Sequence, residues 1–211
     1  MKKGALITFE GGDGSGKSTQ IQRLHEYLES EGYQVLQTRE PGGTQISEAV
    51  RKILLDPQYS DMDPMTECML YAAARAQLVA QVIRPAIEKG VIVICDRFVD
   101  SSIAYQAFGR NLGDAVMQIN NFGIGECMPD LTIYLALDPD LGKNRISGRE
   151  QDRIESESGT FHHRVWQGYE ELCRMYPERI RRIDARGSIE DIEQRIRTEV
   201  KGVLARGHIA P

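Results

Sequence analysis

The sequence contains few cysteines and no cluster of them. Its four cysteines are Cys68, Cys95, Cys127 and Cys173, and no two of them are spaced as C-x-x-C. That spacing is typical of zinc sites and thiol redox motifs, so neither kind of site is predicted. We expect instead small buried thiols in a reducing cytoplasm.

Long apolar runs and an excess of positive charge are also missing. No apolar run approaches the ~20 residues of a membrane span, and the chain opens on a strand-like run rather than a signal peptide. The formal net charge is −5, which argues against broad binding to nucleic acid or to anionic membranes. We therefore expect a cytoplasmic protein with neither a nucleic acid nor a membrane among its partners.

Apolar runs and helix-like stretches alternate along the whole chain. The 211 residues, of which 41% are hydrophobic, are enough for one core, so a single domain over 1–211 is expected. The predicted strands are 5–9, 35–38, 91–95, 131–137 and 180–183. The predicted helices are about 17–31, 45–54, 64–89, 100–122, 139–148, 158–176 and 188–205. This alternation indicates an α/β fold, with a five-stranded parallel sheet covered by helices on both faces.

A glycine-rich motif joins the first predicted strand to the first predicted helix. It fits the P-loop pattern G-x-x-x-x-G-K-[ST]. Its residues, with the one that follows, are Gly11, Gly12, Asp13, Gly14, Ser15, Gly16, Lys17, Ser18 and Thr19. Glycines let successive N–H groups face phosphate oxygens at the positive end of a helix, with Lys17 at the β- and γ-phosphates and Ser18 at Mg²⁺. The alternative is a glycine-rich turn before an ordinary helix, but the flanking pattern favours binding of a nucleoside triphosphate.

A carboxylate ends the third predicted strand. Asp96 and Arg97 directly follow the apolar run 91–95. In P-loop proteins an acid at such a strand end lies beside Mg²⁺, so Asp96 is predicted to hold the ion directly or through water. Arg97 has a fork of N–H donors that could contact both the donor and the acceptor phosphate. The alternative is an Asp-Arg pair that merely ends a strand.

The chain lacks the motifs of the other large P-loop classes. It has no Asn-Lys-x-Asp string to read guanine, and no Asp-x-x-Gly follows a strand where a switch would need it. It is also too short for a motor or transporter ATPase. These absences favour a compact kinase with the three-layer α/β sandwich of P-loop kinases.

A polar segment, 147–160, lies between two predicted helices. It is charged and bounded by glycines, so we expect it outside the core, as a solvated loop or as a lid over bound nucleotide. If 143–153 is helical, Arg145, Arg149 and Arg153 share one side of that helix. Such arginines could stabilise the γ-phosphoryl group and exclude water. A small arginine-bearing lid over about 145–160 is therefore predicted, with a solvated helix as the alternative.

The acceptor is indicated by a pair on the long predicted helix. Tyr71 and Arg75 are one turn apart, so a ring could stack on a base while a guanidinium bonds a carbonyl edge. Taken alone, an aromatic residue and an arginine at this spacing more often only pack against the core and face the solvent. The segments 39–44 and 101–106 follow predicted strands, so they are expected at the same rim as the P-loop.

Taken together, these strings resemble the thymidylate kinase family, which phosphorylates dTMP with Mg·ATP. The resemblance covers essentially the whole chain, and the motifs occur in the family's order, which is far more specific than any one motif. The matching strings are 9–19, 38–44, 71–77, 96–98, 104–106, 129–132, 152–155 and 161–165.

The resemblance implies roles for residues at matching positions. Tyr71 would stack on thymine, Arg75 would bond its O4 edge, and Tyr105 would exclude a ribose 2′-OH beneath the sugar. Arg97 would hold the dTMP phosphate, and Asp13 would bind the 3′-OH and help to order the metal. The other residues expected along the acceptor are Arg39, Pro41, Ser102 and Gln106.

Two details of the resemblance point to the bacterial-type arrangement, and two depart from the family's common pattern. Gly14 stands where eukaryotic-type members carry a catalytic arginine, and basic residues occur in the predicted lid instead. Tyr71 stands where many members have Phe, and Phe98 stands where Tyr or His is common. The base site is therefore expected to differ in detail.

The predicted reaction is magnesium-dependent, in-line transfer from ATP to dTMP, giving dTDP and ADP. The residues expected to carry catalysis are Lys17, Arg97, Arg149, Arg153 and Asp13. The alternatives are another P-loop kinase of nucleotides or small molecules and a non-catalytic nucleotide switch. A homodimer, packed through the apolar side of the 64–89 helix and its neighbours, is implied by the family alone.

Overall fold

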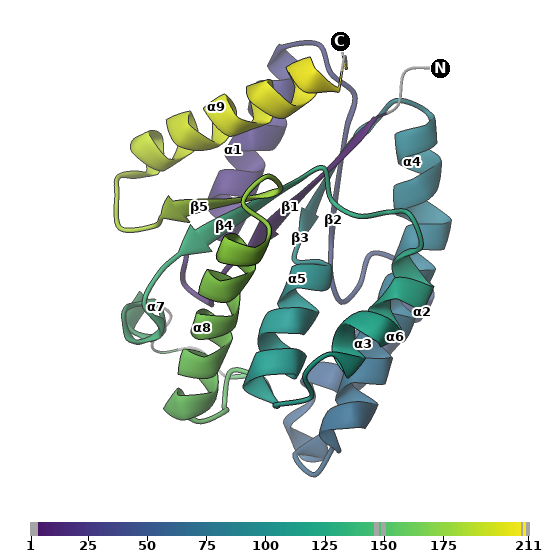
Figure 1. Ribbon diagram of the computed structural model, residues 1–211, viewed down its shortest axis with the longest axis vertical. Coiled ribbons are helices and arrows are strands. Elements are labelled where there is room, and N and C mark those ends of the chain that lie inside the picture. Colours follow the sequence, from purple (N-terminus) through teal and green to yellow (C-terminus); the bar gives the residue numbers. More distant parts are fainter. Residues whose placement is uncertain (1–3, 146–147, 149–150, 208, 210–211) are drawn as a thin grey trace.

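The computed structural model describes residues 4–145, 148, 151–207 and 209, and its sheet is the predicted one (Figure 1). Five parallel strands lie in the order β2-β3-β1-β4-β5. They are β1 (Ala5–Glu10), β2 (Val35–Arg39), β3 (Ile92–Asp96), β4 (Leu131–Ala136) and β5 (Ile180–Asp184). The prediction of an α/β fold with a five-stranded parallel sheet is confirmed.

Helices cover both faces of this sheet (Figure 1). The α-helices are α1 (Lys17–Ser30), α2 (Gln45–Leu55), α3 (Pro64–Leu78), α4 (Arg84–Glu88), α5 (Val99–Ser102), α6 (Ala115–Ile124), α7 (Pro139–Arg145), α8 (Gly159–Met175) and α9 (Ile189–Arg206). The other helical segments are a 3₁₀ turn, η1 (Pro57–Tyr59), and two π-helical segments, η2 (Val79–Ile83) and η3 (Ile103–Gly109). In the part of the chain that is described, no helix combines the length and the apolar character needed to cross a membrane.

Alternate residues of β1 face opposite layers. Ala5, Ile7 and Phe9 join the core formed with α1 and α9, whereas Leu6 joins the core on the other face, with η2 and α5. Because side chains alternate along a strand, Glu10 lies on the same face as Leu6. The last side chain of β1 therefore points towards the layer that contains α5 and α8.

The strand order fixes where a ligand can bind. The chain places β3 and β2 on one side of β1, and β4 and β5 on the other. In open α/β sheets, ligands bind beyond the carboxyl ends of the strands at such a switch point. The P-loop leaves the carboxyl end of β1 and lies at this position.

One predicted helix is wrong in its extent. The stretch 100–122 was expected as one helix, but the structure has α5 and η3, then a break, then α6. Asn111 and Gly113 in the break have φ values of 59° and 58°, in the left-handed region that ends helices. The break lets α6 turn back against α3, where an added Cβ on Gly123 would lie 3.3 Å from the carbonyl oxygen of Ala72.

The segment 147–160 also differs from its prediction. The helix predicted over about 139–148 is described as far as Arg145, and residues 153–156 form turns, so the condition that 143–153 is helical does not hold at its end. The expectation that the segment stays outside the core is wrong at two positions, because Arg153 and Ile154 are buried. Ile154 packs into a cluster with Tyr105 and Phe161, so an apolar side chain among charges anchors the segment. Arg149 lies outside the described residues.

Candidate active site

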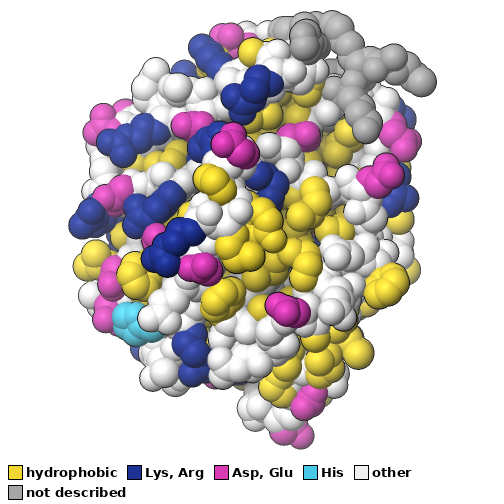
Figure 2. Space-filling model, in the orientation of Figure 1, with side chains coloured by type: hydrophobic (Ala, Val, Ile, Leu, Met, Phe, Trp, Pro, Cys, Tyr) yellow, Lys and Arg dark blue, Asp and Glu magenta, His cyan; other side chains and the backbone are white. Residues whose placement is uncertain are grey.

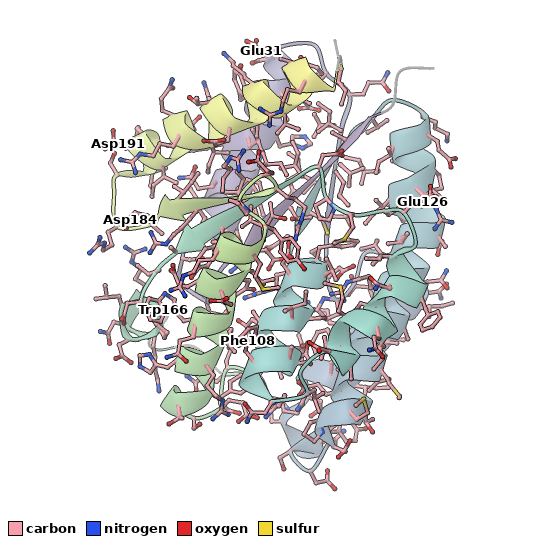
Figure 3. All side chains as sticks on the ribbon, viewed as in Figure 1. Glu31, Phe108, Glu126, Trp166, Asp184 and Asp191 are labelled. Carbon is pink, nitrogen blue, oxygen red and sulfur yellow. The ribbon has the colours of Figure 1, made fainter. Side chains whose placement is uncertain are left out.

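A cleft of 1020 Å³ opens at the carboxyl ends of the strands. It brings together most of the residues predicted for the site. The predicted residues that line it are Asp13, Gly14, Ser15, Gly16, Lys17, Ser18, Thr19, Arg39, Pro41, Tyr71, Arg75, Asp96, Arg97, Ser102, Tyr105 and Gln106. Gly11 lies behind the loop, where an added Cβ would meet the carbonyl oxygen of Leu135 at 2.7 Å. Gly12 lines a neighbouring cavity of 90 Å³ between α7 and α8, which Trp166 also lines (Figure 3).

The P-loop wraps around the ammonium group of Lys17. Nζ donates to the carbonyl oxygens of Gly11 at 2.9 Å and Gly12 at 3.0 Å. Burial, and next the Arg97 guanidinium, lower the pKa of Lys17 to about 8. Gly16, with φ of 90°, caps the start of α1, so the N–H groups of the first helical turn are available to an anion.

Gly14 is in close contact with α7. An added Cβ at Gly14 would lie 2.4 Å from the carbonyl oxygen of Gly142, and one at Gly142 would lie 2.4 Å from that of Asp13. Neither position has space for a side chain. The P-loop of this protein therefore cannot carry an arginine at position 14 without moving α7, and cationic groups must come from elsewhere.

Arg97 connects the P-loop to the acceptor side of the cleft. Its backbone has φ of 67°, and its Nη2 donates to Oδ1 of Asp13 at 2.9 Å. The guanidinium also lies 5.2 Å from the ring centre of Tyr105. Although burial acts in the opposite direction, Arg97 and Lys17 hold the pKa of Asp13 below its ordinary value. Asp13 therefore stays ionised between these two cations.

Asp96 has a carboxylate oxygen suited to a cation. Within the described ranges, its buried Oδ1 has no hydrogen-bond partner, and it lines the same cleft as Ser18. An unpaired buried carboxylate oxygen is costly unless a cation or water meets it. No group of three or more His, Cys, Asp or Glu side chains in the described part of the chain could hold a metal. A magnesium ion held largely by phosphates and water, with few protein ligands, fits this donor set.

Arg75 is the most constrained side chain of the acceptor side, being only 2% exposed. Its Nε donates to Glu40 at 2.6 Å, its Nη2 to the carbonyl oxygen of Phe98 at 2.9 Å, and its Nη1 to Ser102 at 2.8 Å. Nη1 also donates to Oδ1 of Asn120. Since every nitrogen of the guanidinium is held, its orientation is fixed by three separate segments of the chain, which contain Glu40, Phe98 with Ser102, and Asn120.

The remaining acceptor residues surround Arg75. Tyr71 lies one turn before it on α3 and is half-buried, and Phe98 lies beneath the guanidinium, with its ring centre 5.4 Å away. Gln106, on η3, donates to the buried Glu67 at 2.9 Å. Tyr71, Arg75, Ser102 and Gln106 line one part of the cleft, which we call the acceptor slot.

Comparison with known proteins agrees with this geometry. The sequence profile of the thymidylate kinase family matches residues 9–196. The chain belongs to the thymidylate kinase family. It is 50% identical over 195 residues to the thymidylate kinase of an Exiguobacterium species, covering 92% of both chains. It is 45% identical over 210 residues to that of Bacillus licheniformis, covering 98% of this chain and 99% of the relative. The crystal structure of the Ehrlichia chaffeensis thymidylate kinase superposes with a TM-score of 0.77 at 32% identity, covering 94% of this chain and 99% of that one.

Arg39 and Pro41 lie at the rim of this thymidylate kinase cleft. Arg39 is exposed and donates to the Glu48 carboxylate at 3.0 Å. The carbonyl oxygen of Pro41 accepts from Arg51 at 2.9 Å, and Arg51 lines the cleft as well. Arg51 is therefore a further cation at this rim, and the sequence motifs did not indicate it.

Arg153 does not line the cleft in this structure. Its Nε donates to the carbonyl oxygen of Leu54 at 2.7 Å, and its Nη2 lies 2.8 Å from Oε2 of Glu67. The same carboxylate also pairs with Arg110. The structure therefore places this arginine in a buried ion-pair network under the acceptor slot, rather than at the γ-phosphoryl position expected from the sequence.

Sequence reasoning missed several residues that support this site. The residues are Glu10, Glu40, Glu67 and Asn120, whereas Arg145, which also lines the cleft, was among the arginines predicted for the lid. Glu10 and Glu40 lie within the motif strings, directly before the P-loop and before Pro41. Their positions could therefore have identified them as residues near the site. Glu67 and Asn120 carry no local signal, because their partners are distant in sequence. Arg145 donates to the carbonyl oxygens of Gly14 and Ala185 at 3.3–3.4 Å, at the donor rim.

Proposed function

We propose that the cleft holds ATP with Mg²⁺ at the P-loop and dTMP in the slot beside Arg75. The chain carries out the reaction of its family, in which dTMP is converted to dTDP. The observation that carries the assignment of the site is the ion pair between Arg97 and Asp13, 2.9 Å long, where the P-loop meets the acceptor slot. The cation can contact the acceptor phosphate while the loop holds the donor.

On the donor side, backbone N–H groups and Lys17 bind the phosphates. These groups stabilise charge on the β- and γ-phosphates during in-line transfer. Ser18 and Asp96 are the proposed protein ligands of Mg²⁺. The ion would neutralise phosphate charge and help to orient the triphosphate.

On the acceptor side, the thymine ring stacks on Tyr71. Ser102 accepts a hydrogen bond from Arg75, so its own hydroxyl proton is free to donate to the base carbonyl O4. Arg75 supplies the second donor through an N–H that it shares between the base and one of its protein acceptors, Ser102 or the carbonyl oxygen of Phe98. Gln106 lies along the base, and Tyr105 packs beneath the sugar.

Around the phosphates, Asp13 is placed to accept from the 3′-OH of dTMP while it holds Arg97. The exposed Arg39 and Pro41 lie at the acceptor rim. We assign a lid role to the segment of about 145–160, with Arg145 and Arg149 as the cations that approach the donor. Arg153 anchors that segment to Glu67.

A homodimer is proposed through α3 and α6. Phe122 is 93% exposed and Met69 is 54% exposed, and Figure 2 shows hydrophobic side chains gathered over the region that these helices occupy in Figure 1. Exposed apolar patches of this kind commonly mark interfaces. Sedimentation analysis is expected to give a dimer, and Phe122→Asp a monomer. A cytoplasmic location stays a prediction from the sequence.

The direct test is ADP release in the presence of different acceptors. Release stimulated by dTMP, but not by dCMP, dGMP or AMP, supports the assigned base slot. Stimulation by another monophosphate instead would indicate a different acceptor. Slow hydrolysis that no acceptor stimulates would indicate the nucleotide-switch alternative. Omission of Mg²⁺, with EDTA present, is expected to abolish release.

A further inference from the structure

Glu10 is a buried carboxylate directly beneath the reaction site. It is the last residue of β1, its side chain faces the α5 and α8 layer, and it is 0% exposed. A charged side chain this deeply buried is costly unless it is fully hydrogen-bonded. Its partners therefore show what the carboxylate is used for.

One oxygen of Glu10 holds the backbone that follows Arg97. Oε1 accepts from the N–H groups of Phe98 at 2.8 Å and Ser101 at 3.3 Å. Arg97 itself has φ of 67° and donates its own N–H to the carbonyl oxygen of Phe9 at 2.9 Å. A left-handed conformation is strained for a non-glycine residue and persists only when its surroundings hold it. Glu10 stabilises this conformation by accepting from the backbone N–H of Phe98, the residue after Arg97.

The other oxygen of Glu10 holds two hydroxyl groups that also flank the Arg97 guanidinium. Oε2 accepts from Ser101 at 2.5 Å and from Tyr169 at 2.8 Å. Nη1 of Arg97 lies 3.4 Å from each of these hydroxyl oxygens. A hydroxyl has a single proton. When that proton is donated to Glu10, the oxygen presents lone pairs to the guanidinium.

We propose that Glu10 is a positioning residue for Arg97. Its carboxylate fixes the turn that carries Arg97 and orients the hydroxyls of Ser101 and Tyr169 so that they accept from the guanidinium. Glu10 is not among the residues that line the cleft, so it acts on the acceptor phosphate only through Arg97. The inference rests on the proposed function, in which Arg97 holds that phosphate.

The role requires a carboxylate rather than an amide. In the described part of the chain, the groups that hydrogen-bond to Glu10 all donate to it, and a carboxylate only accepts. In Glu10→Gln, Oε1 can still accept from the backbone N–H groups. The new Nε2 donates to the hydroxyls, which lie 2.9 Å from each other. One hydroxyl proton can then be donated to the other hydroxyl, and the remaining proton turns towards the cationic guanidinium. The substitution therefore reverses the orientation of one hydroxyl and keeps the size of the side chain.

The test is a double-mutant cycle read as kcat/KM for dTMP at saturating ATP and at pH 8, above the raised pKa of Glu10. The first variant is Glu10→Gln, the second combines Ser101→Ala with Tyr169→Phe, and the third combines all three changes. Glu10→Gln in the wild-type background is expected to lower kcat/KM about 10- to 100-fold, as for loss of a charge-assisted hydrogen bond. In the background without hydroxyls, the same change is expected to cost less than about 3-fold. Equal losses in the two backgrounds would overturn the proposal.

Melting temperatures and a matched variant separate positioning from general stability. Asp100→Asn removes another buried carboxylate, one that pairs with Arg179 at 2.6 Å. Asp100→Asn is expected to lower the melting temperature and to show the same kcat/KM loss in both backgrounds. If it shows the coupling expected of Glu10→Gln, the proposal is overturned. If Glu10→Gln does not fold, the hydroxyl-free variant alone decides, because an unchanged kcat/KM for dTMP contradicts the role of its hydroxyls.

Arg97→Ala distinguishes failure of the inference from failure of the proposed function. An unchanged KM for dTMP in Arg97→Ala contradicts the assignment of Arg97, and with it both proposals. A large rise in that KM, together with additive losses in the cycle, contradicts only the role of Glu10. A large rise together with coupling supports both.

Discussion

The two ends of the cleft hold their polar groups in different ways. At the acceptor end, Arg75 and Gln106 are buried and donate to other buried side chains. At the donor end, the wall is the backbone of the P-loop, and the nearby Arg145 is exposed and reaches carbonyl oxygens only at 3.3–3.4 Å. The acceptor end is fixed within the protein, whereas the donor end presents backbone amides and exposed side chains.

The difference predicts how strictly each end selects its substrate. Backbone N–H groups bind phosphate whatever base is attached to it. A buried guanidinium with a fixed direction rejects a base whose edge presents N–H groups, because burying unpaired donors costs about 1–3 kcal/mol each. Selection among acceptors should therefore be stricter than selection among donors.

Lys17→Ala should give the largest effect and act on the donor end alone. Loss of the ammonium at the β- and γ-phosphates is expected to lower kcat by at least about 1000-fold. Binding of dTMP, followed by calorimetry, is expected to change less than about 3-fold, since the acceptor network lacks Lys17. Turnover close to that of the wild type would contradict the assignment of Lys17.

Arg153→Gln should act on the acceptor end, although its sequence position predicts a lid residue. It leaves Glu67 buried with one partner fewer, and breaking a buried ion pair costs about 3–5 kcal/mol. We expect a lower free energy of unfolding in urea and a higher KM for dTMP, with kcat less affected. Arg149→Gln is the comparison, and it should lower kcat with little effect on stability. A lower kcat with unchanged stability in Arg153→Gln would indicate instead that Arg153 contacts the phosphates.

Glu10 lies between the two ends, and its ionisation should appear in the pH dependence of stability. Burial, and next the Asp100 carboxylate, raise its pKa from 4.5 to about 7. The folded protein keeps this proton to a higher pH than the unfolded chain does. The contribution to the free energy of unfolding is therefore complete below about pH 4.5 and is lost as pH rises through about 7. The charged and titratable groups that interact with Glu10 are Arg97, Asp100, Tyr169, Lys17, Cys95 and Arg179.

Urea titrations at pH 5 and pH 8 measure this contribution. Between the two values, the wild type should lose more stability than Glu10→Gln, by on the order of 3 kcal/mol. Glu10→Gln has no titrating group at position 10. The change in its free energy of unfolding between pH 5 and pH 8 therefore measures the contribution of all the other titrating groups. Equal losses in the two proteins would show that Glu10 does not titrate in this range.

Asn120→Leu tests the outer layer of the acceptor end with a smaller effect. Its Oδ1 accepts from Arg75, and its Nδ2 donates to the carbonyl oxygen of Val116 at 2.8 Å, which fixes the direction of the amide. Leaving Nη1 of Arg75 without this acceptor is expected to raise KM for dTMP about 10-fold, with KM for ATP unchanged. Asn121→Leu, at an exposed position on the same helix, is the control. Similar KM values for dTMP in Asn120→Leu and Asn121→Leu would show that Asn120 does not support the acceptor site.

Local patterns predicted the fold and the donor end. The P-loop and Asp96 follow apolar strands directly, so their place at the edge of the sheet follows from the strand pattern. The break between η3 and α6 also had a local signal, since Asn111 and Gly113 tolerate left-handed conformations, but the helical periodicity on either side concealed it.

The acceptor end was less predictable because its contacts are long-range. Arg75 depends on Asn120, and Glu67 pairs with Arg153, in each case across dozens of residues. No spacing rule relates such residues. The buried position of Arg153 was missed for the same reason, because a charged segment with one apolar residue has the pattern of a solvated loop. The motif resemblance identified the residues of the slot but not the network that orients them.

The central claim is that the acceptor base is read by Arg75, within a fixed buried network that is separate from the donor site. Calorimetric titration of Arg75→Gln with dTMP and, separately, with Mg·ATP tests it most directly. The Kd for dTMP is expected to rise about 100-fold, since a charge-assisted contact to the base is lost. The Kd for ATP is expected to stay within about 2-fold of the wild-type value, since the P-loop is independent of this network. Equal weakening of both ligands would contradict the claim.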